Sequence, residues 1–457
     1  MSQSFDIAII GGGPGGYVTA IKAGQMGMSV VCIDNSAKLG GTCLNVGCIP
    51  SKALLNITEK YSEVAHLEKY GIKCQGVSFS LEDIMKYKDQ AIADLDRGIK
   101  GLFKKNNVIY INGTGSFIDK NTIEVNGEKI SAKHIIIATG SKPISIPNIT
   151  IDEKKVVSSS GALSLASVPK NLVVVGAGVI GLEMGSVWSR LGSKVTVIEH
   201  GPTVMGASDA DVSSEVEKIL SKQGLQFIMK AEVKQFDGSA IHYRKDGSDM
   251  KIDNVDIVLV AIGRKSNTDG LGLDKVGLKT NMRGQLEVDK QFRTSVSNIY
   301  AIGDVTTGPM LAHKASEEGV ALIEMIAGKK VHINYNTIPN IVYTSPEIAT
   351  VGKSEKQLND EGIQYKVGKF NFAANSRAKA VGDTAGFVKV MVDKRTDEIL
   401  GAAIINRVAG EMIHEIVVAM EFKAASEDIA RISHGHPTMS EAVKEAMLAA
   451  CDKPIHS

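Results

Sequence analysis

Cys43 and Cys48 are the residues whose type and spacing most directly suggest chemistry in this chain. Four residues separate them, and a segment typical of a nucleotide-binding unit comes just before. The other cysteines, Cys32, Cys74 and Cys451, have no neighbour at a comparable spacing, so neither a disulfide framework nor a four-cysteine zinc site can be assembled. The placement predicts a catalytic dithiol, against the alternative of two reduced, packed cysteines.

A regular helix would not let these two thiols meet. Five positions turn about 500° and rise roughly 7.5 Å, beyond the usual ~4.4–6.8 Å between disulfide Cα atoms. Gly47 weakens a helix and Pro50 removes a backbone donor, so the sequence allows a distorted helix that joins the pair. A strained, accessible disulfide is also the kind that exchanges readily.

Thiol chemistry at neutral pH needs a base, because the thiolate is the reactive form. Among ten histidines, His434 and His436 are the most suggestive. His436 precedes a proline, which holds it out of helical geometry, and Glu441 could hold one of its ring nitrogens and raise the basicity of the other. The two histidines could also bind a metal, but no third or fourth ligand is evident nearby, and no metal site is predicted.

Glu441 has a second interpretation. Thr438 and Glu441 match the helix capping box, in which the glutamate returns to the backbone of the threonine. One carboxylate is not expected to serve both roles fully, and without further context capping is the favoured role.

The elements that must position the dithiol begin with a strand over 5–10, a helix to Met26 and a strand over 29–33. Gly11, Gly13 and Gly16 between the first two form the dinucleotide fingerprint. The first makes the tight turn, the second lets backbone N–H groups approach a pyrophosphate, and the third lets the helix pack on the strand. Asp34 would then take the ribose hydroxyls.

The same pattern recurs at Gly176, Gly178 and Gly181, with Glu199 at the same offset as Asp34. Two copies, each after a strand and before a helix, predict two dinucleotide sites rather than glycines that merely serve helix packing. A carboxylate hydrogen-bonds a free ribose 2′-hydroxyl but repels a 2′-phosphate, and no Lys or Arg lies between Glu199 and Met205. The second site is predicted to prefer NAD over NADP.

The remaining pattern predicts an α/β protein with an α+β C-terminal part. Apolar runs over 135–137, 257–262 and 298–302 each lead into a glycine-containing loop that could deliver backbone or a carboxylate to a cofactor. From Pro339 onward the runs suggest an antiparallel sheet, with amphipathic helices from Glu411 and Ser440.

Composition narrows the class of protein. At 457 residues the chain is long enough for two to four domains, and its 46 glycines suit many tight turns. A net charge of +1 gives no argument for nucleic acid or a membrane surface. No apolar run is long enough for a transmembrane helix, and no targeting peptide is recognised, so bacterial cytoplasm or mitochondrial matrix is expected.

Together these residues resemble the flavin-dependent pyridine nucleotide–disulfide oxidoreductases, and within them the branch that oxidises dihydrolipoamide. The resemblance runs over essentially the whole chain and is most specific over 43–52. It implies two Rossmann-like domains, for FAD (1–142) and NAD (143–267), a central domain completing the FAD site (268–336) and a dimerisation domain (337–457). It also implies a homodimer in which His436 and Glu441 reach the disulfide of the other subunit, which favours the catalytic role of Glu441 over capping.

The resemblance assigns roles residue by residue. His436 is implied to take a proton from dihydrolipoamide, Cys43 to exchange with the substrate, and Cys48 to pass electrons to FAD and on to NAD. Lys52 is implied to lie near the flavin and to pair with Glu183. The further implied contacts are Gly115, Thr139, Gly140, Ser141, Asp304, Met310, Leu311, Ala312 and His313 for FAD, and Glu183, Val233 and Gly263 for NAD.

The implied partner is dihydrolipoamide on a lipoylated carrier domain, within a 2-oxoacid dehydrogenase complex or the glycine cleavage system. Two rivals stay open: an NAD(P)H-dependent reductase of another disulfide, which Glu199 and the 49–51 stretch argue against, and a non-catalytic flavoprotein scaffold. The chain departs from the family at Asp34, where glutamate is common, and at 406–408, where a glycine-rich turn is usual. Any partner contact at 406–408 is left open.

Overall fold

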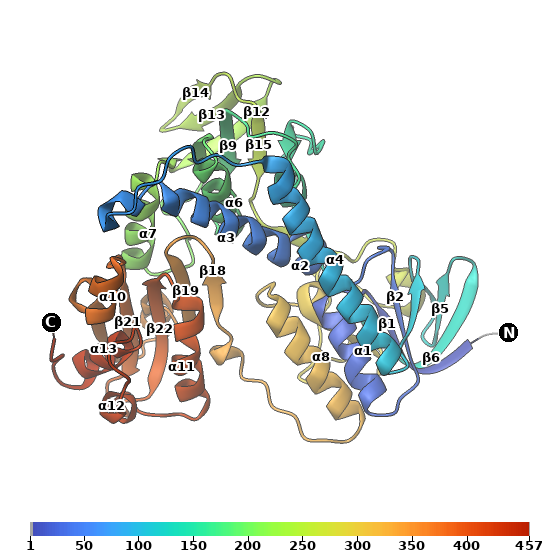
Figure 1. Cartoon of the computed structure of the whole chain (residues 1–457). Coiled ribbons are helices and arrows are strands. Elements are labelled where there is room, and N and C mark those ends of the chain that lie inside the picture. The colour runs from blue at the N-terminus through green and yellow to red at the C-terminus, as the bar shows by residue number, and fades with distance from the viewer. Residues whose placement is uncertain (1–2, 457) are drawn as a thin grey trace.

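The computed structural model describes residues 3–456 and has several lobes (Figure 1). One lobe holds a seven-stranded sheet in the order β3-β2-β1-β6-β5-β4, with β17 paired to β6. β1, β2, β3, β6 and β17 run parallel, and their apolar runs are largely buried, as expected for a parallel sheet covered on both faces. Its strands are β1 (Gln3–Ile10), β2 (Val30–Asp34), β3 (Ile109–Asn112), β4 (Ser116–Asp119), β5 (Thr122–Val125), β6 (Glu128–Ile137) and β17 (Ile299–Ala301).

Two helices far apart in sequence cover this sheet together. α1 (Pro14–Gln25) packs beside α8 (Ala312–Ile326), as Figure 1 shows. Within residues 268–336, all of which the structure describes, the one strand is β17, and it belongs to the first sheet. The segment expected as a central domain therefore builds onto the first lobe, and its exact boundaries stay a prediction.

The second lobe repeats the plan of the first. Its sheet has the order β11-β10-β9-β15-β8 and is parallel throughout, with α6 (Val179–Arg190) after β9. An antiparallel sheet of β12, β13 and β14 packs on it. The elements are β8 (Val156–Val157), α5 (Ser159–Ala162), β9 (Asn171–Val175), β10 (Lys194–Ile198), α7 (Ala210–Lys222), β11 (Gln226–Ile228), β12 (Ala231–Phe236), β13 (Ile241–Lys245), β14 (Ser248–Ile252) and β15 (Ile257–Val260).

A two-stranded ribbon and two helices join these lobes. β7 (Ser141–Pro143) pairs antiparallel with β16 (Arg264–Ser266) at the points where the chain leaves and re-enters the first lobe. α3 (Cys48–Val64) packs against both α6 and α4 (Leu81–Lys105). Ser80 caps α4 through its hydroxyl, with acidic residues in the first turn and Lys104 and Lys105 in the last, which suits the helix dipole.

The C-terminal lobe holds the predicted antiparallel sheet, in the order β18-β19-β22-β21-β20. α11 (Ala409–Glu421) and α13 (Glu441–Cys451) begin close to the predicted starts and pack on the sheet around one apolar core. The α/β prediction with an α+β C-terminal part is confirmed. The other elements are β18 (Asn340–Val342), β19 (Glu347–Gly352), α9 (Glu355–Asp360), β20 (Tyr365–Asn371), α10 (Ser376–Val381), β21 (Phe387–Asp393), β22 (Ile399–Asn406) and α12 (Ser426–Arg431).

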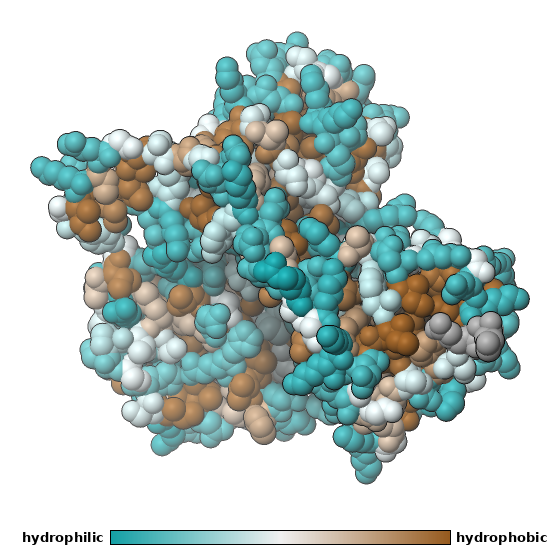
Figure 2. Space-filling view, turned by 45° about the vertical axis from the view of Figure 1, so that its right-hand side comes forward, coloured by the Kyte–Doolittle hydropathy of each residue, from teal (hydrophilic) through white to brown (hydrophobic). Residues whose placement is uncertain are grey.

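Figure 2 shows one face of the molecule, mostly polar, with apolar side chains gathered over the lobe that carries the N-terminal end. Among the described helices, none combines the length and the apolar character needed to cross a membrane.

Candidate active site

The dithiol lies where two helices meet. α2 (Gly41–Val46) carries Cys43 and ends before Gly47, and α3 begins at Cys48. Gly47 has φ −146° and ψ −112°, and a Cβ there would lie 2.8 Å from the carbonyl oxygen of Thr42. The predicted distortion is therefore a helix break at Gly47, which brings the two thiols into hydrogen-bonding contact.

Pro50 also favours the break. It is the third residue of α3, in the first turn, where a backbone N–H has no partner within the helix. In an unbroken helix the bond from residue 50 to the carbonyl of Val46 would be missing and the proline ring would clash with that carbonyl; α2 ends at Val46, so Pro50 contributes to the break as expected.

The two thiols differ in acidity. The pKa of Cys48 is lowered to about 7, because its thiolate accepts a hydrogen bond from Cys43, with the Lys52 ammonium adding to the effect. Cys48 is also the first residue of a long helix, where backbone N–H groups favour a thiolate. The pKa of Cys43 is raised, because it donates that hydrogen bond and is largely buried. Cys48 is thus the more acidic thiol of the pair.

The dithiol is built directly on the first glycine motif. The backbone N–H of Gly40 donates to the carbonyl of Gly12 over 2.8 Å. Gly41 has φ +56°, and a Cβ on it would lie 2.6 Å from the Cα of Gly13. Only glycine fits this approach, so α2 starts in contact with the loop predicted to hold a pyrophosphate.

That loop has the predicted geometry. A Cβ on Gly11, whose φ is +115°, would lie 2.2 Å from a carbonyl oxygen of the neighbouring strand, and one on Gly16 would lie 1.7 Å from the carbonyl oxygen of Gly11. A Cβ on Gly13 would meet its first protein atom only at 3.8 Å. The second glycine alone has free space before it, at the N-terminus of α1, and this space fits the pyrophosphate of FAD.

The second motif repeats these distances. A Cβ on Gly176 would lie 2.4 Å, and one on Gly181 2.0 Å, from backbone oxygens, whereas no protein atom lies within 4 Å of a Cβ on Gly178. The residues therefore fit a second dinucleotide at the N-terminus of α6, as predicted for NAD.

The two predicted acids occupy equivalent positions. Asp34 accepts from the N–H groups of Gly12 at 2.5 Å and Ser36 at 2.8 Å. Glu199 accepts from the N–H groups of Ala177 at 2.7 Å and Gly201 at 2.6 Å. Each carboxylate closes the strand end onto its own glycine turn, which fixes the edge where a ribose would bind.

Three strand ends converge beside the first motif. The Ser141 hydroxyl donates to Asp304 over 2.5 Å and accepts from Nε of Arg264 over 2.7 Å. The Thr139 hydroxyl donates to the carbonyl of Asn267 over 2.6 Å. Three predicted FAD residues, Thr139, Ser141 and Asp304, are thus brought together, and Arg264 is added to them.

Arg264 was missed as a site residue. Burial lowers its pKa, against which Asp304 and Cys48 act to raise it. The sequence placed Gly263 and Arg264 at the end of a predicted strand, which could have marked Arg264 as a site residue. Nothing in the sequence indicates that the Arg264 side chain turns toward Ser141.

The remaining predicted cofactor residues are spread around these motifs. Gly140 and Gly263 have φ of +71° and +123°; no protein atom lies within 4 Å of a Cβ on Gly140, whereas a Cβ on Gly263 would contact the Ile144 side chain at 3.6 Å. Gly115 is packed among three isoleucine side chains, and Val233 belongs to an apolar core cluster. The Met310–His313 segment leads into α8, and His313 Nε2 lies 2.9 Å from the carbonyl of Pro339. Cofactor contacts at these positions stay predictions.

Lys52 and Glu183 pair as expected. The ammonium lies 3.0 and 2.9 Å from the two carboxylate oxygens and 4.5 Å from the centre of the Tyr343 ring. Glu183 is buried and also accepts from the backbone N–H of Tyr343 at 2.9 Å. The pair joins the dithiol helix to the second lobe, while a contact between Glu183 and NAD stays a prediction.

His436 and Glu441 also come together. Nδ1 of His436 lies 3.0 Å from Oε1 of Glu441, and the other carboxylate oxygen accepts from the N–H of Thr438 over 2.8 Å. The two oxygens of this carboxylate thus face two donors, one on the histidine ring and one on the backbone. The capping box itself is incomplete, since α13 begins at Glu441 and the Thr438 hydroxyl bonds to Gly435 instead.

The His436 ring is 67% exposed, and no hydrogen bond within the described chain joins this dyad to the cysteine pair. Its Nε2 is left free to meet a substrate. This placement suits a base that acts on another subunit.

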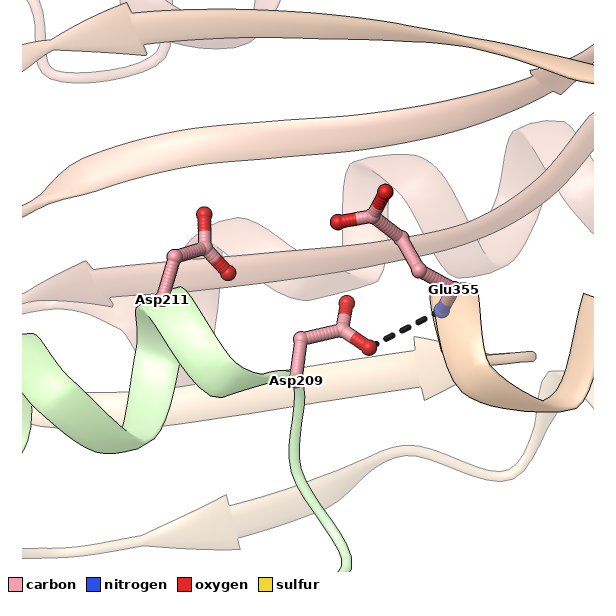
Figure 3. Close-up of side chains that lie close together, drawn as sticks. All are labelled: Asp209, Asp211 and Glu355. Atoms are coloured by element: carbon pink, nitrogen blue, oxygen red, sulfur yellow. Dashed lines mark hydrogen bonds between the residues drawn. The ribbon is translucent and has the colours of Figure 1, made fainter. Parts of the chain in front are cut away.

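One acidic cluster resembles a metal site but is filled by a lysine. Asp209, Asp211 and Glu355 face one another where α7 meets the C-terminal lobe (Figure 3). The fully buried ammonium of Lys389 lies 3.0 Å from Asp209 and 2.8 Å from Asp211, and it also contacts Glu355. The lysine occupies the place of a cation and ties the two lobes together.

Comparison with known proteins agrees with this geometry. Residues 5–319 match the pyridine nucleotide-disulphide oxidoreductase family, and residues 338–447 match the dimerisation domain of the same family. The chain belongs to the pyridine nucleotide-disulphide oxidoreductases.

Individual proteins similar to this chain indicate a narrower group within that family. A mitochondrial dihydrolipoyl dehydrogenase of Pisum sativum is 51% identical over 466 residues, which cover 100% of this chain and 93% of the relative. The dihydrolipoyl dehydrogenase of Cupriavidus necator is 50% identical, with 100% of both chains covered. The crystal structure of LpdA from Mycobacterium tuberculosis superposes with a TM-score of 0.88 at 26% identity, covering 97% of this chain and 99% of that one.

These findings confirm the resemblance stated from sequence and, with it, FAD and NAD as the cofactors. The dimerisation domain supports the predicted homodimer, while the cellular compartment stays a prediction.

Proposed function

We propose that this protein oxidises dihydrolipoamide to lipoamide with reduction of NAD, using the Cys43–Cys48 pair and FAD. The observation that carries the proposal is the position of the dithiol, which α2 and α3 place against the first glycine motif. Cys48, at the start of α3 and near Lys52, is the acidic thiol, and Cys43 retains its proton. Both lie on helices that meet beside the loop that would hold FAD, so one thiol can exchange with a substrate while the other faces the cofactor.

The protein steps follow from this asymmetry. With the pair oxidised, His436 of the second subunit accepts a proton from one thiol of dihydrolipoamide. The substrate thiolate attacks the sulfur of Cys43, and the Cys43–Cys48 bond breaks to release the Cys48 thiolate. The second substrate thiol then displaces Cys43, which closes the lipoamide ring and leaves both cysteines reduced.

The cofactors would be held by the two motifs. Gly13 and the N-terminus of α1 would bind the FAD pyrophosphate, with Asp34 on the ribose, and Gly178, α6 and Glu199 would do the same for NAD. Bound FAD would supply an acceptor for the electron pair of the reduced dithiol and a hydride donor for NAD. Lys52 would stabilise negative charge on this side of the dithiol, because its ammonium is held by Glu183.

Glu441 would orient the base. Its Oε1 fixes Nδ1 of His436, which leaves Nε2 as the proton acceptor, and its bond to the Thr438 N–H fixes the carboxylate itself. The relevant unit is the homodimer. Val418 on α11, Phe422 just after that helix and Ile432 just after α12 are 57%, 82% and 52% exposed in the dimerisation domain, and a second subunit would cover such side chains.

The decisive experiment measures NAD-dependent oxidation of dihydrolipoamide by the purified, yellow protein. We expect Cys43→Ser to reduce turnover by at least about a thousandfold and His436→Gln by about 10²–10⁴-fold, both with FAD retained. Cys74→Ser, at an exposed cysteine outside the site, is the matched control. Full activity in Cys43→Ser would refute the mechanism, and a large preference for NADPH would identify a reductase of another disulfide instead.

We further infer that the natural substrate is dihydrolipoamide on a lipoylated carrier domain of a 2-oxoacid dehydrogenase complex or the glycine cleavage system. Dihydrolipoyl dehydrogenases across the full chain length support this role. Purified lipoylated carrier domains from each system, compared by kcat/KM, would separate these partners. Equal rates with all carriers and with free dihydrolipoamide would contradict selection by the carrier.

A further inference from the structure

A second histidine–glutamate pair lies beside the first. Nε2 of His434 is 2.7 Å from Oε1 of Glu415, and Nδ1 is 3.1 Å from the carbonyl oxygen of Ile432. The His434 side chain is 7% exposed, whereas that of His436 is 67% exposed. Two histidines one residue apart therefore have different environments, one turned into the protein and one toward solvent.

Both ring nitrogens of His434 meet acceptors only. A neutral imidazole carries one N–H, so both contacts are hydrogen bonds only when the ring carries two protons. The contact to Glu415 engages Nε2, and the contact to the carbonyl of Ile432 engages Nδ1. His434 thus has no free nitrogen with which to accept a proton from a substrate.

Glu415 stands on a rigid element. It lies in the middle of α11, whose neighbouring residues Ile413 and Ile416 are completely buried in the core of the C-terminal domain. The segment over 432–440 has no regular structure and connects α12 to α13. A bond from His434 to Glu415 therefore fixes a loop to a packed helix.

The loop has one other anchor on each side of this bond. Lys444 Nζ donates to the carbonyl of Ile432 over 3.1 Å, and Asn375 Nδ2 donates to the carbonyl of Thr438 over 3.0 Å. Between Ile432 and His436, the side chain of His434 bonds to a helix outside the loop, through Glu415 of α11. The position of the His436 ring then depends on His434, Glu415 and its own bond to Glu441.

We propose that His434 and Glu415 form a positioning pair for the His436 base. The proposal rests on the proposed function, because it gives the pair no chemistry of its own. A displacement of about 1 Å at a reacting group can cost roughly 10²-fold in rate, so a loop anchor two residues from the base can control turnover without touching the substrate.

The test compares dihydrolipoamide oxidation in Glu415→Ala and His434→Gln with that in the unmodified holoenzyme. Because the base is misplaced while the substrate still binds, we expect kcat to fall about 10- to 100-fold with little change in KM. NADH-driven reduction of a soluble quinone, which bypasses the base, should stay within about twofold. Glu415→Gln keeps an acceptor for Nε2–H and should recover most of the lost rate.

Two controls separate positioning from general damage. His456→Gln removes a similar pair, 2.7 Å long, with Glu445 of α13, and should leave kcat unchanged. In a His436→Gln background, Glu415→Ala should cause no further loss, because residues that act through one group are not additive. Size-exclusion chromatography checks that each assayed variant is a dimer. If Glu415→Ala does not form a dimer, His434→Gln provides the same test.

The outcomes distinguish this inference from the proposed function. Wild-type turnover in His436→Gln would overturn the function itself. A slow His436→Gln beside a fully active Glu415→Ala, or losses that add in the double variant, would overturn only the positioning role.

Discussion

The two dinucleotide-binding units of this chain share a motif but differ in what surrounds it. In both, the first and third glycines are in close contact with backbone, and an acid closes the turn. In the first unit, α2 packs against the second glycine, with the Cα of Gly41 3.8 Å from a Cβ on Gly13. In the second unit, no protein atom lies within 4 Å of a Cβ on Gly178.

The difference matches two ways of using a dinucleotide. The first unit places the dithiol against its motif, so a cofactor bound there is partly covered by the group that it serves. The second unit leaves its motif open, which suits a co-substrate that must enter and leave in each turnover. With FAD and NAD bound as proposed, the same local sequence pattern would serve a resident cofactor in one lobe and an exchangeable one in the other.

The largest expected effect comes from the third glycine of each unit. A Cβ in Gly16→Ala would lie 1.7 Å from the Gly11 carbonyl oxygen, and one in Gly181→Ala would lie 2.0 Å from that of Gly176. Each helix must shift, at a cost of about 1–3 kcal/mol or more. We expect Gly16→Ala to lose bound flavin and all activity, and Gly181→Ala to stay yellow but lose NAD-dependent activity. Flavin absorbance measures bound flavin, and turnover measures activity. A Gly16→Ala protein with a full complement of bound flavin would contradict the assignment of FAD to the first unit.

The sequence predicts these motifs well because their information is local. A glycine that must have positive φ, such as Gly11 or Gly176, and an acid at a fixed offset are all within one βαβ unit. The break between Cys43 and Cys48 is local too, since Gly47 and Pro50 both lie within this short segment. Strand and helix limits consequently agree with the prediction to within a few residues.

The second glycines give the next effect. Gly178→Ala places a methyl group in open space, so stability should not change, but the methyl group would stand where the pyrophosphate approaches. We expect KM for NAD to rise roughly 10- to 100-fold with flavin retained. Gly13→Ala should instead weaken FAD binding and leave the apoprotein folded. Gly98→Ala is the control, because Gly98 is an exposed position on α4 and no protein atom lies within 4 Å of a Cβ there. An unchanged KM in Gly178→Ala would place NAD elsewhere.

What the sequence could not predict depends on residues far apart in the chain. Arg264, Ser141 and Asp304 form one cluster although more than a hundred positions separate Ser141 from each of the others. Lys389 and its three carboxylates span two lobes in the same way. The division of labour on Glu441 was missed for another reason, because only coordinates show which oxygen faces which donor.

The acids give a smaller effect. Glu199 accepts two backbone N–H groups, so in Glu199→Gln the amide NH₂ must face one donor. We expect KM for NAD to rise about tenfold and discrimination against NADP to narrow, because the charge that repels a 2′-phosphate is gone. Glu232→Gln, which removes an exposed ion pair with Lys234, should change neither constant. Asp34→Asn should affect flavin retention rather than KM, and an effect on NAD alone would contradict the assignment of the two units.

The smallest expected effect concerns the contact that joins the two units, Lys52 of α3 with Glu183 of α6. The pKa of Cys48 is lowered to about 7, so its thiolate predominates above that pH and is lost below it. Lys52→Met removes the nearby positive charge and leaves the negative charge of Glu183 without its partner. Both the lost attraction and the unbalanced repulsion disfavour the Cys48 thiolate. We expect the pH midpoint for alkylation of Cys48 by iodoacetamide, measured in the reduced protein by peptide mass spectrometry, to rise by about one pH unit.

Lys60→Met, farther along α3, is the control and should leave this midpoint unchanged. A midpoint that does not move in Lys52→Met would mean that the Cys43 hydrogen bond and the start of the helix suffice to hold the thiolate, and that the two units are joined mechanically but not electrostatically.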